Sequence, residues 1–285
     1  MNLFKFKKVY SFILAIFVFF SLTNVSCLKK AKSNNVGVVF DTIQINKTQS
    51  VNFKGSKLNC NLHIIFTYPL SCEKASLLDD LQKIFNEKFF PSQYANLSPK
   101  EAANNFSTQY INDFKSAKIS NFFDEDYMLE DENDFIYELD LENEILFSKD
   151  NFISFVVKNT NYEGGAHGSN SIHGYVIDLH TGKILTDEDL IGDNYKKNIS
   201  SLLVQKIAEE KEVKDISQLE SMGYNAIEDI VPNENFTIDD KGITYYFNEY
   251  EIAAYFVGTT EVFIPYGELK NYINKDSPIT ALAGL

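Results

Sequence analysis

The chain contains no arginine: all 26 basic residues are lysines, set against 40 acidic residues, and the formal net charge is −14. Without guanidinium groups, the chain cannot clamp a phosphate or a carboxylate through the paired N–H donors that arginine offers. Affinity for nucleic acid rests on cationic contacts to phosphates, so we expect no nucleic-acid partner. An acidic surface instead attracts a basic partner, although solubility alone also explains such a charge.

Cysteine is also scarce, with only three in 285 residues. Besides Cys27, the chain has Cys60 and Cys72, which are a possible disulfide if the protein reaches an oxidising compartment. The segment 61–68 between them has the pattern of a strand that Pro69 ends. A straight strand would hold the two sulfur atoms too far apart for a bond, so pairing requires the chain to double back after Pro69.

The N-terminus carries an apolar run at residues 10–22, preceded by three lysines. This order predicts an export signal over residues 1–26. A small residue directly before Cys27 resembles a lipobox, so we expect lipid modification of Cys27, with ordinary cleavage or an uncleaved anchor as alternatives. Residues 27–37 are then a tether. Loss of the three lysines changes the charge from −14 to −17. We expect an exported, membrane-anchored lipoprotein that faces the periplasm or the cell surface.

Strand and helix patterns alternate in the first half of the remaining chain. β-Branched residues predict strands at 38–45 and 61–67, and alternation of apolar and acidic residues predicts another at 135–142. Two helices are indicated between them, the first by an apolar stripe and the second by a capping box formed by Ser98 and Glu101. The stripe consists of Leu77, Leu81, Ile84, Phe85 and Phe89.

The second half continues the mixture. Its predicted elements are strands at 152–157, 171–179 and 262–264, a hairpin at 236–247, and helices at 195–208 and 266–273. Gly182 and Gly242 are expected to supply positive φ angles in turns. We therefore predict an α+β fold with antiparallel sheets, each covered by helices, in two small domains. These comprise residues 38–149 and 150–275, and a tail follows at 276–285.

Three of the four histidines gather in one stretch and raise the question of a zinc site with Glu163 as base. They are His167, His173 and His180. Seven residues of strand separate the last two by roughly 23 Å, at about 3.3 Å per residue, so these two cannot share one metal. A Gly-x-Ser-x-Gly elbow is also missing. We therefore assign no metal, no cofactor and no catalytic residue, and we expect His63 to be a packed, hydrogen-bonded strand residue.

The densest glycine cluster lies at residues 162–168, with the sequence YEGGAHG. Three glycines and an alanine in five residues let the backbone bend tightly and approach another surface closely. One interpretation is structural, a bend from which His167 returns to hydrogen-bond strand ends; the other is a recognition loop. The candidate binding residues are Tyr162, Glu163, Gly164, Gly165, Ala166, His167 and Gly168.

Three segments together resemble the C-terminal domain of the RsiV-like family. They are YEGGAHGSNS at 162–171, YVIDLHTGK at 175–183 and YEIAAYFVGTTEVFIPYGEL at 250–269. Family members are extracytoplasmic modules, found in a lysozyme-sensing anti-sigma factor and beside peptidoglycan deacetylase domains. IIFTYP at 64–69 resembles the smaller domain that precedes this one in the family.

The resemblance implies a non-enzymatic α+β binding module, and its lysozyme-sensing member binds lysozyme directly. Lysozyme is basic, which suits an acidic surface. Unlike the lysozyme-sensing anti-sigma factor, this sequence shows no sigma-binding segment. Unlike the family members with a peptidoglycan deacetylase domain, it shows no such domain. We expect a non-catalytic envelope lipoprotein that binds a protein, such as a lysozyme-type muramidase, or a cell-wall glycan. The alternative is a cell-wall glycan hydrolase or deacetylase that uses His167.

Overall fold

The computed structural model describes residues 37–53, 56–116, 135–163, 166–191, 195–225 and 227–285. The expected signal over residues 1–26, the lipidation site Cys27 and all but the last residue of the tether lie outside these ranges. Within them, no helix combines the length and the apolar character that a membrane crossing requires.

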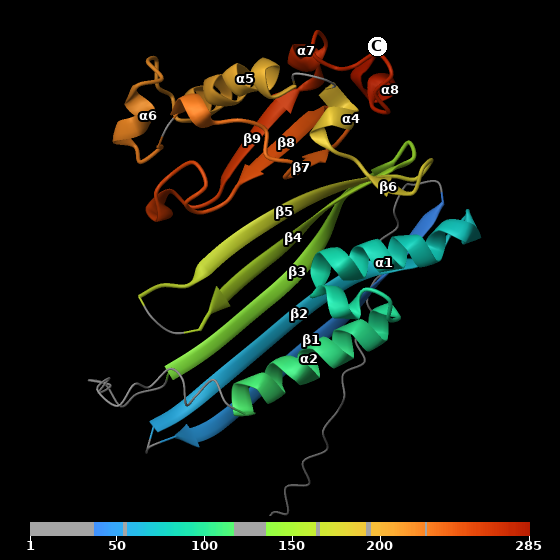
Figure 1. Cartoon of the computed structure of the whole chain (residues 1–285), viewed down its shortest axis with the longest axis vertical. Helices are drawn as coiled ribbons and strands as arrows, with labels where there is room; N and C mark the ends of the chain where they lie inside the picture. Colours follow the sequence, from blue (N-terminus) through green and yellow to red (C-terminus); the bar gives the residue numbers. More distant parts are fainter. Residues whose placement is uncertain (1–36, 54–55, 117–134, 164–165, 192–194, 226) are drawn as a thin grey trace, which may run out of the picture.

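A six-stranded sheet dominates the fold, and its strands lie side by side in the order in which they occur in the chain (Figure 1). They are β1 (Val38–Phe53), β2 (Ser56–Cys72), β3 (Phe135–Lys149), β4 (Phe152–Tyr162), β5 (Ser169–Asp178) and β6 (Lys183–Ile184). Neighbouring strands are antiparallel except β2 and β3, which are parallel. Parallel neighbours need a crossover connection, and the helical segment between them supplies it.

The crossover places two helices on one face of this sheet, α1 (Leu78–Phe89) and α2 (Pro99–Ser116). α1 follows the predicted stripe, with Leu81, Phe85 and Phe89 buried. The predicted capping box opens α2: the Ser98 hydroxyl donates to Glu101 Oε2 at 2.6 Å, and the Ser98 amide donates to the same oxygen at 3.2 Å. The carboxylate thus satisfies an amide that the helix start leaves without a partner.

A second layer covers the other face of the sheet at its β4–β5 side (Figure 1). Its antiparallel sheet contains β7 (Phe236–Ile238), β8 (Gly242–Phe247) and β9 (Thr260–Pro265), and its helices are α4 (Asp187–Ile191), α5 (Tyr195–Glu210), α6 (Gln218–Ser221), α7 (Tyr266–Leu269) and α8 (Thr280–Ala283). Packing is close where Gly174 on β5 faces β7, since a Cβ atom there would lie 2.6 Å from the carbonyl oxygen of Phe236. Beside it, the buried Ser154 hydroxyl accepts a hydrogen bond from the Ile238 amide at 2.9 Å.

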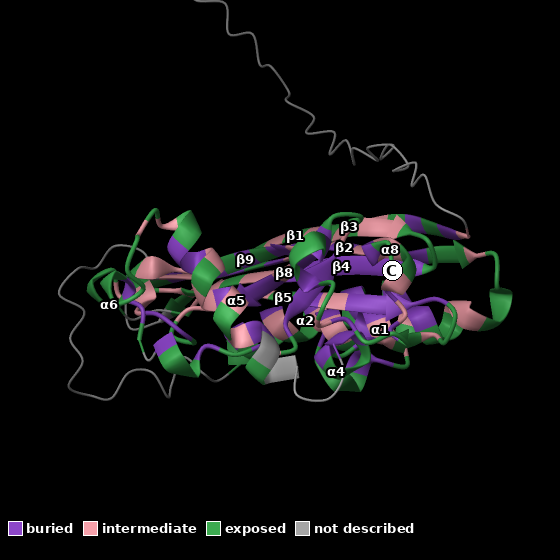
Figure 2. Ribbon diagram, turned by 90° about the horizontal axis from the view of Figure 1, so that it is seen from above, coloured by how far each residue is buried: buried purple, intermediate pink, exposed green. Residues whose placement is uncertain are grey.

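The predicted α+β class is confirmed, with helices over both sheets. Buried residues follow the strands (Figure 2) and form two apolar cores, one for each face of the large sheet. Ile153 belongs to the core under α1 and α2, whereas Phe152 belongs to the core of the second layer. The predicted boundary at residue 150 falls in the β3–β4 turn, where Asp150 and Asn151 have φ angles of 55° and 69°.

Cys60 and Cys72 are both free. The expectation that Pro69 ends the second strand is wrong, because β2 continues to Cys72 and passes Pro69 opposite an irregularity in β1. Twelve residues of strand hold the two cysteines roughly 40 Å apart, which excludes the possible disulfide within the chain. Burial, followed by the charge of Glu163, raises the pKa of Cys60 to about 11, so its thiol is unreactive at neutral pH.

The two predicted glycine turns have different outcomes. Gly182 has a φ of 74°, as expected, whereas Gly242 does not adopt a positive φ. A Cβ atom at Gly242 would instead collide with the carbonyl oxygen of Ile264 on the neighbouring strand. Glycine is therefore needed there for the close approach of β8 and β9, and the turn itself is fixed by Asp239, whose carboxylate accepts from the Lys241 amide at 2.7 Å.

Candidate functional site

His167 lies in the loop that joins β4 and β5. Its ring stacks on Tyr255, with ring centroids 4.0 Å apart and planes inclined by 25°. Nδ1 lies 2.9 Å from the carbonyl oxygen of Gly168, and because a carbonyl only accepts, Nδ1 carries the proton. Nε2 is then the acceptor for the Tyr250 hydroxyl, at 3.4 Å. The ring is thus held by partners on both of its nitrogens.

Both tyrosines come from the segment between β8 and β9, which lies above the β4–β5 hairpin in Figure 1. Tyr250 is 65% exposed and has a φ of 66°, and its ring stacks on Tyr255 with centroids 5.6 Å apart. The Tyr255 hydroxyl donates to the Gly168 carbonyl at 3.2 Å. We call His167, Tyr250 and Tyr255 the aromatic platform.

Hydrogen bonds to β5 hold the platform segment in place. The Glu249 carboxylate accepts from the Asn170 amide nitrogen at 3.2 Å and from the Asn170 side chain at 2.9 Å. One residue earlier, Asn248 accepts from the Ile172 backbone amide at 2.7 Å. Tyr250 therefore follows directly after two residues that are fixed to the large sheet. This restricts the platform before any ligand arrives, and such pre-organisation favours binding.

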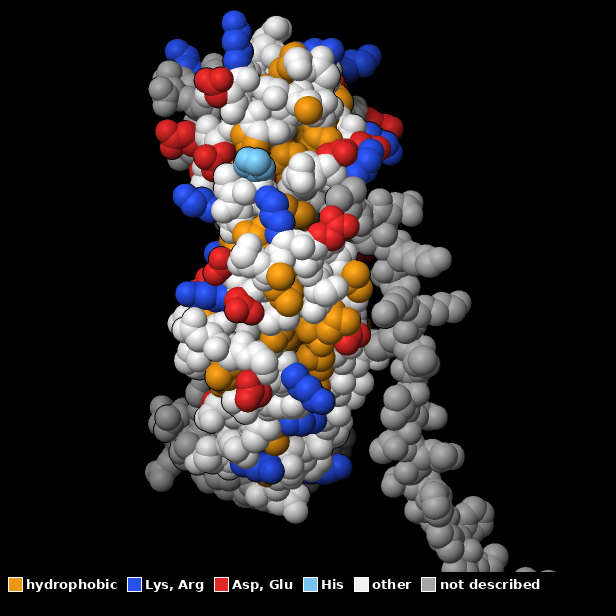
Figure 3. All heavy atoms as spheres, turned by 90° about the vertical axis from the view of Figure 1, so that its right-hand side faces the viewer, with side chains coloured by type: hydrophobic (Ala, Val, Ile, Leu, Met, Phe, Trp, Pro, Cys, Tyr) orange, Lys and Arg blue, Asp and Glu red, His pale blue; other side chains and the backbone are white. Residues whose placement is uncertain are grey.

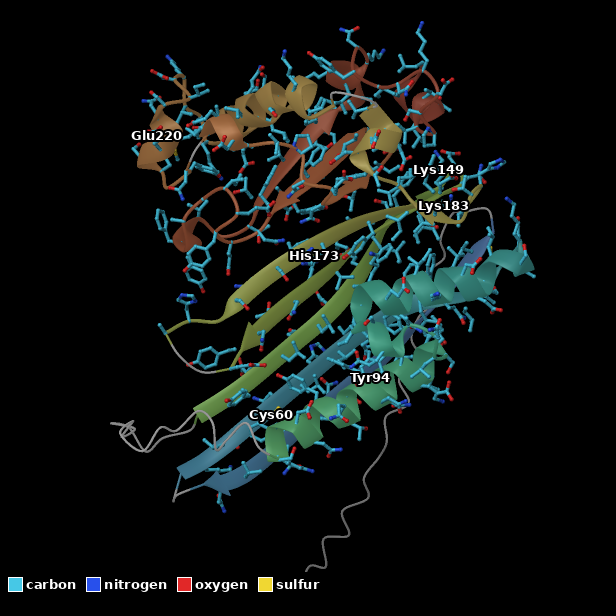
Figure 4. The ribbon with its side chains drawn as sticks, in the orientation of Figure 1. Cys60, Tyr94, Lys149, His173, Lys183 and Glu220 are labelled. Atoms are coloured by element: carbon cyan, nitrogen blue, oxygen red, sulfur yellow. The ribbon has the colours of Figure 1, made fainter. Side chains whose placement is uncertain are left out.

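Of the candidate residues, Gly168 contacts the His167 ring through its carbonyl, whereas the other histidines and Cys60 lie elsewhere. His173 lies along β5 and His180 in the turn beyond it, while Cys60 lies on β2 beside α2 (Figure 4). Glu163 is exposed and acts electrostatically on Cys60. Gly164 and Gly165 are outside the described residues. Among the residues that the structure describes, no group of three His, Cys, Asp or Glu side chains could hold a metal ion.

Sequence reasoning missed the two tyrosines of the platform. They occur in the segment EYEIAAYFVG, where Tyr250 and Tyr255 are five residues apart and no helix or strand period explains them. Two further exposed apolar residues lie nearby in this part of the fold, Phe256 at 76% and Met222 at 38% exposure. The signal that the sequence offered was a pair of aromatic residues outside any helix or strand period, which core packing does not account for.

The large sheet, the helices on one face and the second layer on the other define an α+β module. Residues 64–170, from β2 to β5, match a protein-family model described as deacetylase PdaC. Residues 188–267, which form most of the second layer, match the model of a family described as a protein of unknown function, DUF3298. Both matches agree with the expected extracytoplasmic family, and they divide the chain between residues 170 and 188.

Solved structures of the DUF3298 family resemble the whole module. A member from Bacteroides fragilis NCTC 9343 is 28% identical to this chain, with a TM-score of 0.77. The match covers 87% of this chain and 98% of the Bacteroides chain. A DUF3298 protein from Pseudomonas aeruginosa PAO1 is 13% identical with a TM-score of 0.55, covering 83% and 95%, and shows likeness of fold alone. No curated protein matches the chain.

Proposed function

We propose that the chain is an exported lipoprotein of the cell envelope and that its folded part is a non-catalytic binding module. The observation that carries this proposal is the aromatic platform, which presents Tyr250 to solvent while its neighbours are hydrogen-bonded to the large sheet. Tyrosines that are exposed yet held in place are frequent centres of binding energy at protein interfaces.

A basic protein is the ligand that the charge favours, and a lysozyme-type muramidase is the first candidate. The face shown in Figure 3 carries acidic and lysine side chains interspersed, so the excess of acid is not gathered there. Beside the platform, by contrast, Glu249 and Glu251 flank Tyr250, and Glu251 is exposed. Such carboxylates steer a cationic partner toward the tyrosines.

Replacing Tyr250 by alanine is expected to weaken the complex with a basic muramidase by at least about tenfold, because a central aromatic anchor contributes about 2 kcal/mol or more. Calorimetric titration of the purified exported part with hen-type lysozyme measures this. Binding should also weaken between low and high salt, since the carboxylates are screened. Leu70→Ala, which changes an exposed residue on β2, is the control. Absence of lysozyme binding at low salt contradicts the muramidase version.

The lipid anchor is tested separately. Cys27→Ser removes the thiol to which a lipid would be attached, so the protein is expected to move from the membrane fraction to the soluble exported fraction. Stable attachment takes two signals, such as two lipid chains or one chain with a basic segment, so loss of the lipid is expected to release the protein. Fractionation followed by immunoblotting measures the distribution, with Cys72→Ser as control. A Cys27→Ser variant that stays in the membrane fraction after its signal has been removed contradicts lipidation.

A hydrolase or deacetylase that uses His167 is the second candidate, and the match to a model described as deacetylase PdaC is the observation in its favour. The geometry of His167 gives this candidate less support. Its two nitrogens face the Gly168 carbonyl and the Tyr250 hydroxyl, and no carboxylate pairs with it among the described residues. General acid–base catalysis needs a base that is oriented and free to reach its substrate.

A further inference from the structure

The second layer leaves part of the large sheet uncovered. It packs over β4 and β5, whereas the corresponding face of β1, β2 and β3 carries exposed or half-exposed polar side chains. His63 belongs to this open face. It was expected to be packed and hydrogen-bonded; its Nδ1 does pair with Asp140 Oδ1 at 2.9 Å, but the side chain remains 39% exposed.

A hollow of about 330 Å³ lies around this pair. Its outward-facing side chains come from four strands and include Asn46, Thr48, Asn61, His63, Asp140 and Thr160. The volume lies within the range of about 300–1,000 Å³ that small-molecule sites occupy. All six side chains are polar, so the hollow offers an incoming ligand hydrogen bonds.

Hydrogen bonds between strands arrange these groups in rows. The Thr48 hydroxyl donates to Asn61 Oδ1 at 3.2 Å, and the Asn61 amide donates to Glu138 Oε1 at 3.5 Å. In the next row, Asn46 lies opposite His63, which pairs with Asp140. Within the described residues, the second carboxylate oxygen of Asp140 and the Asn46 amide have no protein partner. Each row therefore keeps both donors and acceptors for a ligand.

The charge of the hollow excludes anionic ligands. Asp140 and Glu138 both line it, and Lys47, which borders it, directs its ammonium group to Ser107 on α2 at 2.9 Å. A phosphate or a uronate would meet two carboxylates, while Lys47 turns its ammonium group away from the hollow. Carboxylates, amides and an imidazole together match a neutral molecule that carries many hydroxyl and amide groups.

The hollow is also connected to the aromatic platform. Thr160, at its edge, donates to Asn170 Oδ1 at 2.9 Å, and Asn170 in turn bonds Glu249, the residue before Tyr250. This polar line crosses from β1 to β5, which at about 4.8 Å between strands is roughly 19 Å. An extended chain of sugar rings fits such a line, because it presents hydroxyl groups along its length and C–H faces to aromatic rings.

From these observations we infer that the open face of the large sheet binds a neutral oligosaccharide, with its centre at His63 and Asp140 and one end at the aromatic platform. The inference rests on the proposed function and deepens it, since it names a ligand class for the binding module. A ligand at the hollow meets residues of β1, β2 and β3 that the platform does not use, so the two surfaces can be tested separately.

Titration calorimetry with chitotetraose and cellotetraose, two neutral tetrasaccharides, tests the inference. The wild-type protein is expected to bind at least one of them, and His63→Ala and Asp140→Asn should each weaken this binding by about tenfold through loss of hydrogen bonds to the sugar. His180→Ala, which removes an exposed histidine in the turn after β5, should change it less than about twofold. Thermal unfolding of each variant confirms that the fold is intact.

Lysozyme binding is measured on the same preparations. Absence of binding to both tetrasaccharides, or binding that His63→Ala and Asp140→Asn leave unchanged, overturns the inference even if lysozyme still binds. Tetrasaccharide binding that depends on His63 supports the inference, whether or not lysozyme binds. If lysozyme does not bind, only the muramidase version of the proposed function is contradicted.

Discussion

Phe85→Ala is expected to lower the free energy of unfolding by about 3–5 kcal/mol, which is the usual cost of emptying a buried phenylalanine site. Phe85 is fully buried on α1, and its ring stacks on Phe155 of β4 with centroids 4.4 Å apart. The contact joins the helical layer to the centre of the large sheet. Since domains of this kind are stable by about 5–15 kcal/mol, the variant loses a large part of its stability.

Phe256→Ala is the matched control, because it removes the same side chain from a site that is 76% exposed. It is expected to change the free energy of unfolding by less than about 0.5 kcal/mol. Urea unfolding followed by far-UV circular dichroism measures both variants. Equal destabilisation by the two substitutions would mean that α1 does not contribute the core contact that its apolar stripe predicts.

The sequence allowed the local elements to be predicted well, because each depends on nearby residues. The stripe through Leu81 and Phe85 requires only the helical period, and the capping box of Ser98 and Glu101 only a spacing of three residues. Asp178 and Gly182 likewise form their turn within five residues, the carboxylate accepting from the His180 amide at 2.8 Å. Patterns of this length are visible in a single sequence.

Sheet topology depends on contacts that no local pattern records. Leu58 on β2 lies opposite Phe135 on β3, a pairing that connects residues far apart in the chain, and it makes the two strands parallel where antiparallel sheets were predicted. For the same reason, a domain boundary was predicted at residue 150, whereas the structure has a hairpin there and two cores that share the sheet. Residues on opposite faces of β4 belong to the two different cores.

The candidate site likewise combines a local feature that the sequence predicted with distant partners that it did not. The glycine-rich loop drew attention to His167, but its partners Tyr250 and Tyr255 lie more than eighty residues further along the chain. His63 was assigned to an apolar strand, and its strand is indeed apolar on the face toward α2. The opposite face of the same strand is polar and open, and only the pairing with Asp140 on β3 reveals a site there.

Gly174→Ala is expected to destabilise the protein by about 1–3 kcal/mol through overpacking, the range for an extra group forced into a filled interior. The added Cβ atom would lie 2.6 Å from the carbonyl oxygen of Phe236 and 3.0 Å from a methyl group of Thr237. Backbone cannot yield as a flexible side chain does, so β7 must move away from β5. The same movement displaces Asn235, which accepts from the Gly174 amide at 2.6 Å.

Gly267→Ala is the control, because its Cβ atom would meet nothing within 4 Å and the residue lies in α7. Its effect on unfolding should be small, or a gain of up to about 1 kcal/mol from helix propensity. Asn248 and Glu249 also bind β5, so a shift of β5 should disturb the aromatic platform. Gly174→Ala is therefore expected to weaken ligand binding at Tyr250 and to lower the melting temperature. A variant that melts earlier yet binds normally would show that the platform is held by its own loop and not by the contact between the two layers.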